Sequence, residues 1–166
     1  MAVPPSPTPN TASALFLRDA ELRRGMELLY FAYGHLTRAS DADLASHGLG
    51  RAHHRALYFV ARKPDLTVSA LLALLAITKQ SLGRVLNELT ERGLVEIRAG
   101  ETDRRQRLLR LTSAGAALES ALFEAARQRV AAAYARAGQQ AVSGYWSVLE
   151  GMIPESERGH IDSLGR

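Results

Sequence analysis

The sequence predicts a mainly α-helical protein that carries one small β-hairpin, and three observations lead to this fold class. Alanine, leucine and arginine are abundant, and all three favour helices. Apolar side chains recur every three or four positions along most of the chain, which is the period of a helix with one buried face. Residues 94–112 instead alternate apolar and polar side chains on either side of a polar turn, as two paired strands do.

Length and composition limit the classes of protein to consider. A chain of 166 residues, 46% hydrophobic and 23% charged, suits one soluble domain or two tightly joined halves. Cysteine is absent, which excludes disulfides, thiolate metal sites and thiol-based redox sensing. No apolar run approaches the ~20 residues of a membrane helix, and MAVPPSPTPNTAS lacks the basic and apolar regions of a secretory signal. A cytoplasmic protein with no membrane partner is expected.

The predicted elements begin with a disordered tail at 1–13 and one long helix from 14 to about 38, followed by a linker to residue 50. This helix is too long for a small domain alone to cover. Its apolar stripe consists of Leu15, Leu22, Met26, Leu29, Tyr33 and Leu36.

Three further helices should follow. The first is at 51–62 and is ended by Pro64, and the other two begin after Thr67 and after Thr78, because threonine is a good N-cap. Gly93 should end the third of them, and its buried face should comprise Leu82, Val85, Leu86 and Leu89.

After the hairpin, Thr112 or Ser113 should cap an alanine-rich helix to about residue 137. Gly138 should break it before a last helix to residue 153, and a loose tail should occupy 154–166.

Helix, short helix, capped helix and hairpin in this order are the parts of a winged helix-turn-helix, here at residues 51–112. Residues 14–50 and 113–153 would then supply dimerisation helices. The third helix of the module would enter the major groove of DNA. Its candidate contacts are Thr78, Lys79, Gln80, Ser81, Gly83, Arg84 and Asn87.

Gly83 is unusual among these candidates because glycine costs roughly 1 kcal/mol in a helix interior. Close approach of the backbone to DNA would explain it, and tight helix packing would explain it equally well. The net charge of +4 permits nucleic-acid binding without requiring it.

The run from Leu66 to Gly115 resembles the core of the MarR family of bacterial transcription regulators. Its most specific phrases are NELTERGLVE and DRRQRLLRLTSAG, while AHHRALYFV and ITKQSL further resemble a PetP-like subgroup from α-proteobacteria. The resemblance implies an obligate homodimer whose terminal helices interlock and whose two winged modules read a pseudo-palindromic site on double-stranded DNA. Repression is the expected outcome of binding, with activation as the alternative.

The resemblance also assigns roles in the hairpin turn. Asp103 would hold the arginines by charge-assisted hydrogen bonds, and Arg105 would enter the minor groove. Arg104 and Arg107 would contact phosphates or brace the turn. The alternative is a purely structural pair between Asp103 and an arginine.

Many relatives bind a small anionic or phenolic effector between the dimer helices and the winged module. Candidate lining residues here are Tyr30, Tyr33, His35, His53, His54 and Tyr58, although each could equally be a core or interface residue.

No cofactor is expected. The neighbouring His53 and His54 raise the alternative of a metal- or haem-responsive regulator, but adjacent helix positions point about 100° apart. They would therefore need a further ligand, such as His35 or His47.

Two other function classes fit the sequence less well. An interaction module that has lost DNA binding would not need basic residues such as Lys79, Arg84 and Arg105 on an exposed face. An enzyme is not expected, because the chain has no G-x-S-x-G elbow and no H-E-x-x-H motif.

Overall fold

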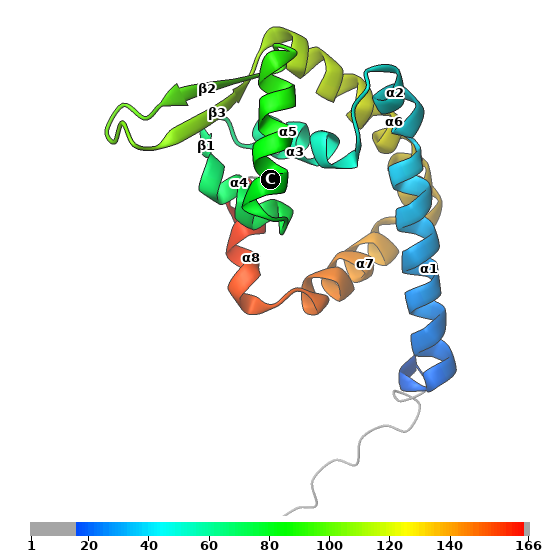
Figure 1. The fold of residues 1–166 in the computed structure, drawn as a ribbon. Helices are drawn as coiled ribbons and strands as arrows, with labels where there is room; N and C mark the ends of the chain where they lie inside the picture. The colour runs from blue at the N-terminus through cyan, green and yellow to red at the C-terminus, as the bar shows by residue number, and fades with distance from the viewer. Residues whose placement is uncertain (1–15, 165–166) are drawn as a thin grey trace, which may run out of the picture. The chain divides into compact units, whose positions relative to one another are not determined.

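The computed structural model describes residues 16–164, so the predicted tail at 1–13 lies outside the described residues (Figure 1). The chain divides into two compact units, one ending at Arg38 and one beginning at Ala39. The elements in order are α1 (Asp19–Arg38), α2 (Asp41–Ser46), α3 (Arg51–Arg62), β1 (Leu66–Thr67), α4 (Val68–Leu75), α5 (Lys79–Glu91), β2 (Val95–Ala99), β3 (Arg107–Leu111), α6 (Ser113–Ala137), α7 (Gln139–Met152) and α8 (Glu155–Asp162).

The first unit contains α1, which begins at Asp19, a few residues later than the sequence predicts. Asp19 and Glu21 place negative charge in its first turn, where the helix dipole favours it. None of its residues is buried, and Met26 and Tyr33 of the predicted apolar stripe are 56% and 60% exposed. In a single chain, Leu22, Met26, Leu29 and Tyr33 of this stripe are thus exposed and Leu36 is half-buried, while Leu15 lies outside the described residues.

The core of the second unit lies among α3, α4, α5, α6 and the sheet. The predicted inner face of α5 is fully confirmed, with Leu82, Val85, Leu86 and Leu89 all buried. Leu57 of α3, Leu109 of β3 and Leu122 of α6 join them in one apolar cluster. The amphipathic pattern of α5 thus fixes which of its faces remains available to solvent.

A threonine caps each of α4, α5 and α6. Thr67, Thr78 and Thr112 accept hydrogen bonds, each 3.1 Å long, from the backbone N–H groups of Ala70, Ser81 and Gly115. Thr112 also donates to the carbonyl oxygen of Gly93 at 2.6 Å. These bonds satisfy amide groups that a helix start leaves without partners.

The strands form a three-stranded antiparallel sheet in the order β1–β3–β2. Ile97 of β2 and Leu66 of β1 both pair with Leu109 of β3. The predicted hairpin is confirmed, but the sequence missed β1, because a strand of two residues is too short to show an alternating pattern. Asp65, which has a left-handed φ of 63°, precedes β1, and its carboxylate accepts two hydrogen bonds from the guanidinium of Arg110.

Two segments expected to be irregular are helical. The predicted linker contains α2, whose Leu44 is buried, and Ser40 just before it donates a 3.4 Å hydrogen bond from Oγ to the carbonyl oxygen of Leu122. The expectation of a loose tail at 154–166 is wrong for 155–162, which form α8. Pro154 sits just before α8, where its fixed φ is compatible with a helix start, and acidic Glu155 occupies the first turn.

Within residues 16–164, no single helix is long and apolar enough to cross a membrane; α4 and α5 would reach that length and apolarity only together, and they are bent by 116°.

Candidate nucleic-acid interface

The face of α5 opposite the core carries every residue that the sequence proposed for DNA contact, and all seven are exposed. Thr78 and Ser81 are partly occupied by capping, since the Thr78 hydroxyl also donates to Ser81 Oγ at 2.9 Å. Within the described part of the chain, no hydrogen bond or ion pair engages the side chains of Lys79, Gln80, Arg84 and Asn87. Their donors and acceptors remain available to a ligand.

Gly83 lies in the middle of this exposed face. A Cβ atom built on it would have no atom within 4 Å outside its own helix backbone. Packing within the chain therefore does not explain the glycine, and close approach of another molecule to the α5 backbone stays a prediction.

The end of α5 determines how the hairpin leaves the helix. Gly93 adopts a left-handed φ of 66°, and Leu94 donates a 2.9 Å hydrogen bond back to the carbonyl oxygen of Leu89. This is the hydrogen-bond pattern of a glycine-terminated helix. The backbone then enters β2 directly, and Figure 1 shows the β2–β3 hairpin projecting from the helical part of its unit.

The turn between β2 and β3 is held by its own backbone. Gly100 donates to the carbonyl oxygen of Gln106, and Gln106 donates to that of Asp103, both at 3.0 Å. A Cβ atom on Gly100 would lie 2.6 Å from the same Asp103 oxygen, so the turn needs glycine there.

Asp103 has a different partner from the one that the family resemblance implies. Its Oδ1 accepts a 2.9 Å hydrogen bond from the backbone N–H of Arg105 instead of bonding a guanidinium. An aspartate commonly closes a turn in this way by bonding the amide two residues ahead. The side chains of Arg104, Arg105 and Arg107 are exposed, and among the described residues they have no carboxylate partner.

Of the histidines proposed for an effector or a metal, His53 has structural partners. His53 Nδ1 accepts a 3.1 Å hydrogen bond from the Gly50 amide at the start of α3. Its Nε2 is 2.9 Å from Glu88 Oε2 on α5, close enough for an ion pair although the two atoms do not form a well-directed hydrogen bond. Burial lowers the pKa of His54, and the nearby Asp41 partly opposes this. Across residues 16–164, no three side chains of metal-ligand type come together.

The proposed effector residues fall on different elements. Tyr30, Tyr33 and His35 lie on α1 in the first unit, whereas His53, His54 and Tyr58 lie on α3 in the second. The Tyr58 ring packs against Phe59 and Phe123, with ring centres 5.4 and 6.4 Å apart. Tyr58 is thus part of an aromatic contact between α3 and α6.

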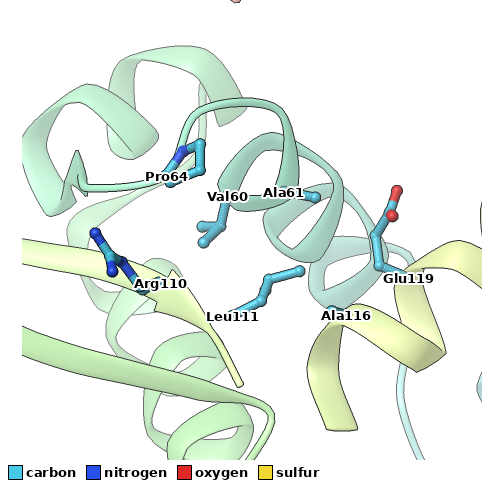
Figure 2. Close-up of a pocket in the computed structure, with 7 residues that line it drawn as sticks. All are labelled: Val60, Ala61, Pro64, Arg110, Leu111, Ala116 and Glu119. Carbon is cyan, nitrogen blue, oxygen red and sulfur yellow. The ribbon is translucent and has the colours of Figure 1, made fainter. Parts of the chain in front are cut away.

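A cavity of about 470 Å³ lies elsewhere in the second unit, between α3, β3 and α6 (Figure 2). We call it the α3–β3–α6 groove, and it is lined by Val60, Ala61, Pro64, Arg110, Leu111, Ala116 and Glu119. Sequence reasoning missed it because the lining is spread over three elements. One signal was present: Glu119 follows Gly115 by four residues and precedes Leu122 by three, so a carboxylate falls on the inward stripe of α6.

Comparison with known proteins agrees with this architecture. A model described as the MarR family matches residues 47–106. The chain is 49% identical over 156 residues to the HTH-type transcriptional regulator PetP of Rhodobacter capsulatus, covering 94% of each chain. Among solved structures, it resembles a MarR-family transcriptional regulator from Silicibacter pomeroyi (TM-score 0.67, 22% identity, 87% of this chain and 94% of that one). It also resembles Streptococcus pneumoniae FabT in complex with DNA (TM-score 0.68, 19% identity, 79% and 94%).

Proposed function

The chain belongs to the MarR family of helix-turn-helix transcription regulators, and from this premise we propose that it binds a pseudo-palindromic operator as a homodimer and acts as a cytoplasmic repressor. Family membership confirms both the resemblance found in the sequence and the expectation that the protein is not an enzyme. The mode of DNA binding, the dimer and the control of binding are inferred from the arrangement of the side chains.

The observation that carries the proposal is the exposed face of α5. Lys79 and Arg84 suit phosphates or guanine edges, and Gln80 and Asn87 suit adenine, because each can present the matching donors and acceptors. The opposite face of α5 is anchored in the core by Leu82 and Leu89. A major groove accommodates a helix presented in this way.

The hairpin supplies a second contact. Asp103 fixes the backbone at Arg105, so the Arg105 side chain starts from a defined point at the tip of the hairpin. We assign Arg105 to the minor groove, where a narrow groove concentrates negative potential. Arg104 and Arg107 are assigned to phosphate contacts on either side.

The exposed apolar surface supports a homodimer. Met26 and Tyr33 on α1 and Trp146 on α7 are each more than half exposed in the single chain. Large exposed apolar faces are typical of interaction surfaces, and twofold pairing is the commonest way in which identical chains cover them. A homodimer would place two α5 helices on adjacent half-sites, and a small effector that changes their separation would control binding.

Titration with the DNA upstream of the protein's own gene tests the proposal. The protein should bind this DNA tightly, and log K should fall with log salt concentration with a slope of about −5 for six phosphate contacts. Fluorescence anisotropy at several salt concentrations measures both quantities, with a shuffled duplex of the same length as the control. Equal affinity for the two duplexes together with a flat salt dependence would refute the proposal.

Gly83 offers a test in which stability and binding should change in opposite directions. Gly83→Ala should raise the free energy of unfolding by about 1 kcal/mol, because alanine favours the helix and the position is open. The same methyl group should weaken operator binding about tenfold if it separates α5 from DNA, since about 1.4 kcal/mol corresponds to a factor of ten.

Chemical denaturation and anisotropy measure the two effects of Gly83→Ala. The matched control is Gly159→Ala in α8, a helical position that is equally open. The control should gain stability and keep its affinity. A Gly83→Ala protein with unchanged affinity would show that DNA does not approach this part of α5.

A further inference from the structure

The α3–β3–α6 groove has the size and lining of a small-molecule site. Its volume of about 470 Å³ lies within the range of roughly 300–1,000 Å³ that ligand pockets occupy. Ala61, Leu111 and Ala116 give its accessible apolar surface, above the buried Val60, and the carboxylate of Glu119 stands at one side (Figure 2). All of its lining residues belong to the second unit, and none lies on α5 or in the hairpin turn.

Glu119 is the charged lining residue whose carboxylate has no hydrogen-bond donor among the described residues. Its side chain is half-buried, and within residues 16–164 it accepts no hydrogen bond and forms no ion pair. Burial raises the pKa of the Glu119 carboxyl, and the charge of Arg62 only partly offsets this. Partial removal of a carboxylate from water without a protein donor has a cost, so a ligand that brings a donor would relieve part of it.

The other charged lining residue is already neutralised. Arg110 donates from Nε to Asp65 Oδ1 at 3.1 Å and from a second nitrogen to Asp65 Oδ2. In Figure 2 its guanidinium points away from the side of the groove that holds Glu119. Arg62, which lies near Glu119, donates a 3.2 Å hydrogen bond to the carbonyl oxygen of Leu164. The groove thus offers an apolar surface beside one carboxylate that lacks a donor.

We propose that the α3–β3–α6 groove binds a small organic cation, an ammonium group attached to an aromatic or aliphatic body. The ammonium donates to the Glu119 carboxylate, and the apolar body covers Ala61, Leu111 and Ala116. A site of this kind differs in charge preference from the anionic or phenolic effectors that the family resemblance implies. The site can also be tested independently of DNA binding, because ligand binding is measured on the protein without DNA.

Tryptamine is a suitable probe, since it joins an ammonium group to an indole. Calorimetric titration of the full chain with tryptamine should give saturable binding. Backbone amide signals of Ala61, Leu111 and Ala116 should shift in nitrogen–proton spectra. Tryptophol, which replaces the ammonium with a hydroxyl, and indole-3-acetate, which is an anion, should each bind at least tenfold more weakly. Binding of tryptamine should weaken as the pH falls, because burial raises the pKa of Glu119 and its carboxylate is therefore protonated at a higher pH than that of an ordinary glutamate.

Glu119→Gln is the decisive variant because it keeps the shape and removes the charge. It should lose at least tenfold in tryptamine affinity while its melting temperature and DNA affinity stay close to those of the wild type. The matched control is Glu124→Gln, on the same helix but paired with Arg127 outside the groove, and it should bind tryptamine normally.

Three results would overturn the proposal. These are indole-3-acetate binding as tightly as tryptamine, amide shifts that avoid the groove, and equal tryptamine affinities for wild type and Glu119→Gln. A change of oligomeric state in Glu119→Gln with tryptamine binding unaltered would assign the groove to an interface between chains instead. If the wild-type protein did not bind DNA, the proposed function would be refuted, but the proposal for the ligand site would still stand.

Discussion

Gly115→Ala should lower the free energy of unfolding by about 3 kcal/mol, at the upper end of the usual cost of overpacking. Gly115 is buried at the start of α6, and a Cβ atom there would lie 2.0 Å from the carbonyl oxygen of Leu94 and 2.9 Å from its carbon. Both contacts are with backbone, so no side-chain rotation can relieve them. The same Leu94 oxygen accepts a 3.1 Å hydrogen bond from the Thr112 amide, and displacing it would weaken that bond too.

Urea unfolding followed by circular dichroism measures the loss in Gly115→Ala. Gly83→Ala is the matched control, since the same substitution at an open helical position should stabilise the chain. If Gly115→Ala were as stable as the wild type, the first turn of α6 could not be packed against the start of β2 as described.

Arg105→Ala should weaken operator binding by about 10- to 100-fold, which corresponds to roughly 1–3 kcal/mol for a specific arginine contact. The folded protein should be unaffected, because the Arg105 side chain is exposed and has no partner among the described residues. The backbone amide that bonds Asp103 is kept in the variant. The loss should therefore appear in DNA binding alone.

Anisotropy titrations at fixed salt compare Arg105→Ala with Arg129→Ala, which removes the same charge from the exposed surface of α6. The control should shift affinity only slightly, through net charge. Arg105→Lys is informative as well, since lysine keeps the charge but not the planar guanidinium. If Arg105→Ala and Arg129→Ala bound equally well, the hairpin would have no role beyond general electrostatics.

Most of the second unit could be predicted from the sequence because its signals are local. The caps at Thr67, Thr78 and Thr112 depend on residues only three positions away, and the inner face of α5 follows from helical spacing. The elements that were missed depend on contacts distant in the chain. β1 exists through pairing with β3, and the segment of α2 is held by bonds from Ser40 to α6 and from Arg92, after α5, to the His47 carbonyl oxygen.

In the candidate site, too, features set by local sequence could be predicted, whereas features set by the folded turn or by packing between elements could not. Exposure of the α5 residues could be predicted, because burial of one helix face leaves the other to solvent. The partner of Asp103 could not, since a carboxylate beside several arginines suggests ion pairs while the turn brings a backbone amide closer. The α3–β3–α6 groove could not be predicted either, because it depends on how three separate elements pack.

Thr112 has a consequence for how a signal could reach DNA. Its hydroxyl bonds both the first turn of α6 and the Gly93 carbonyl oxygen just after α5, and its amide bonds the residue that leads into β2. The start of α6, the end of α5 and the root of the hairpin therefore form one joint. A tilt of α6 would carry the helix and the hairpin together without changing the angle between them. In the proposed homodimer, control would then act on the distance between the two winged modules, and each module would keep its own internal geometry.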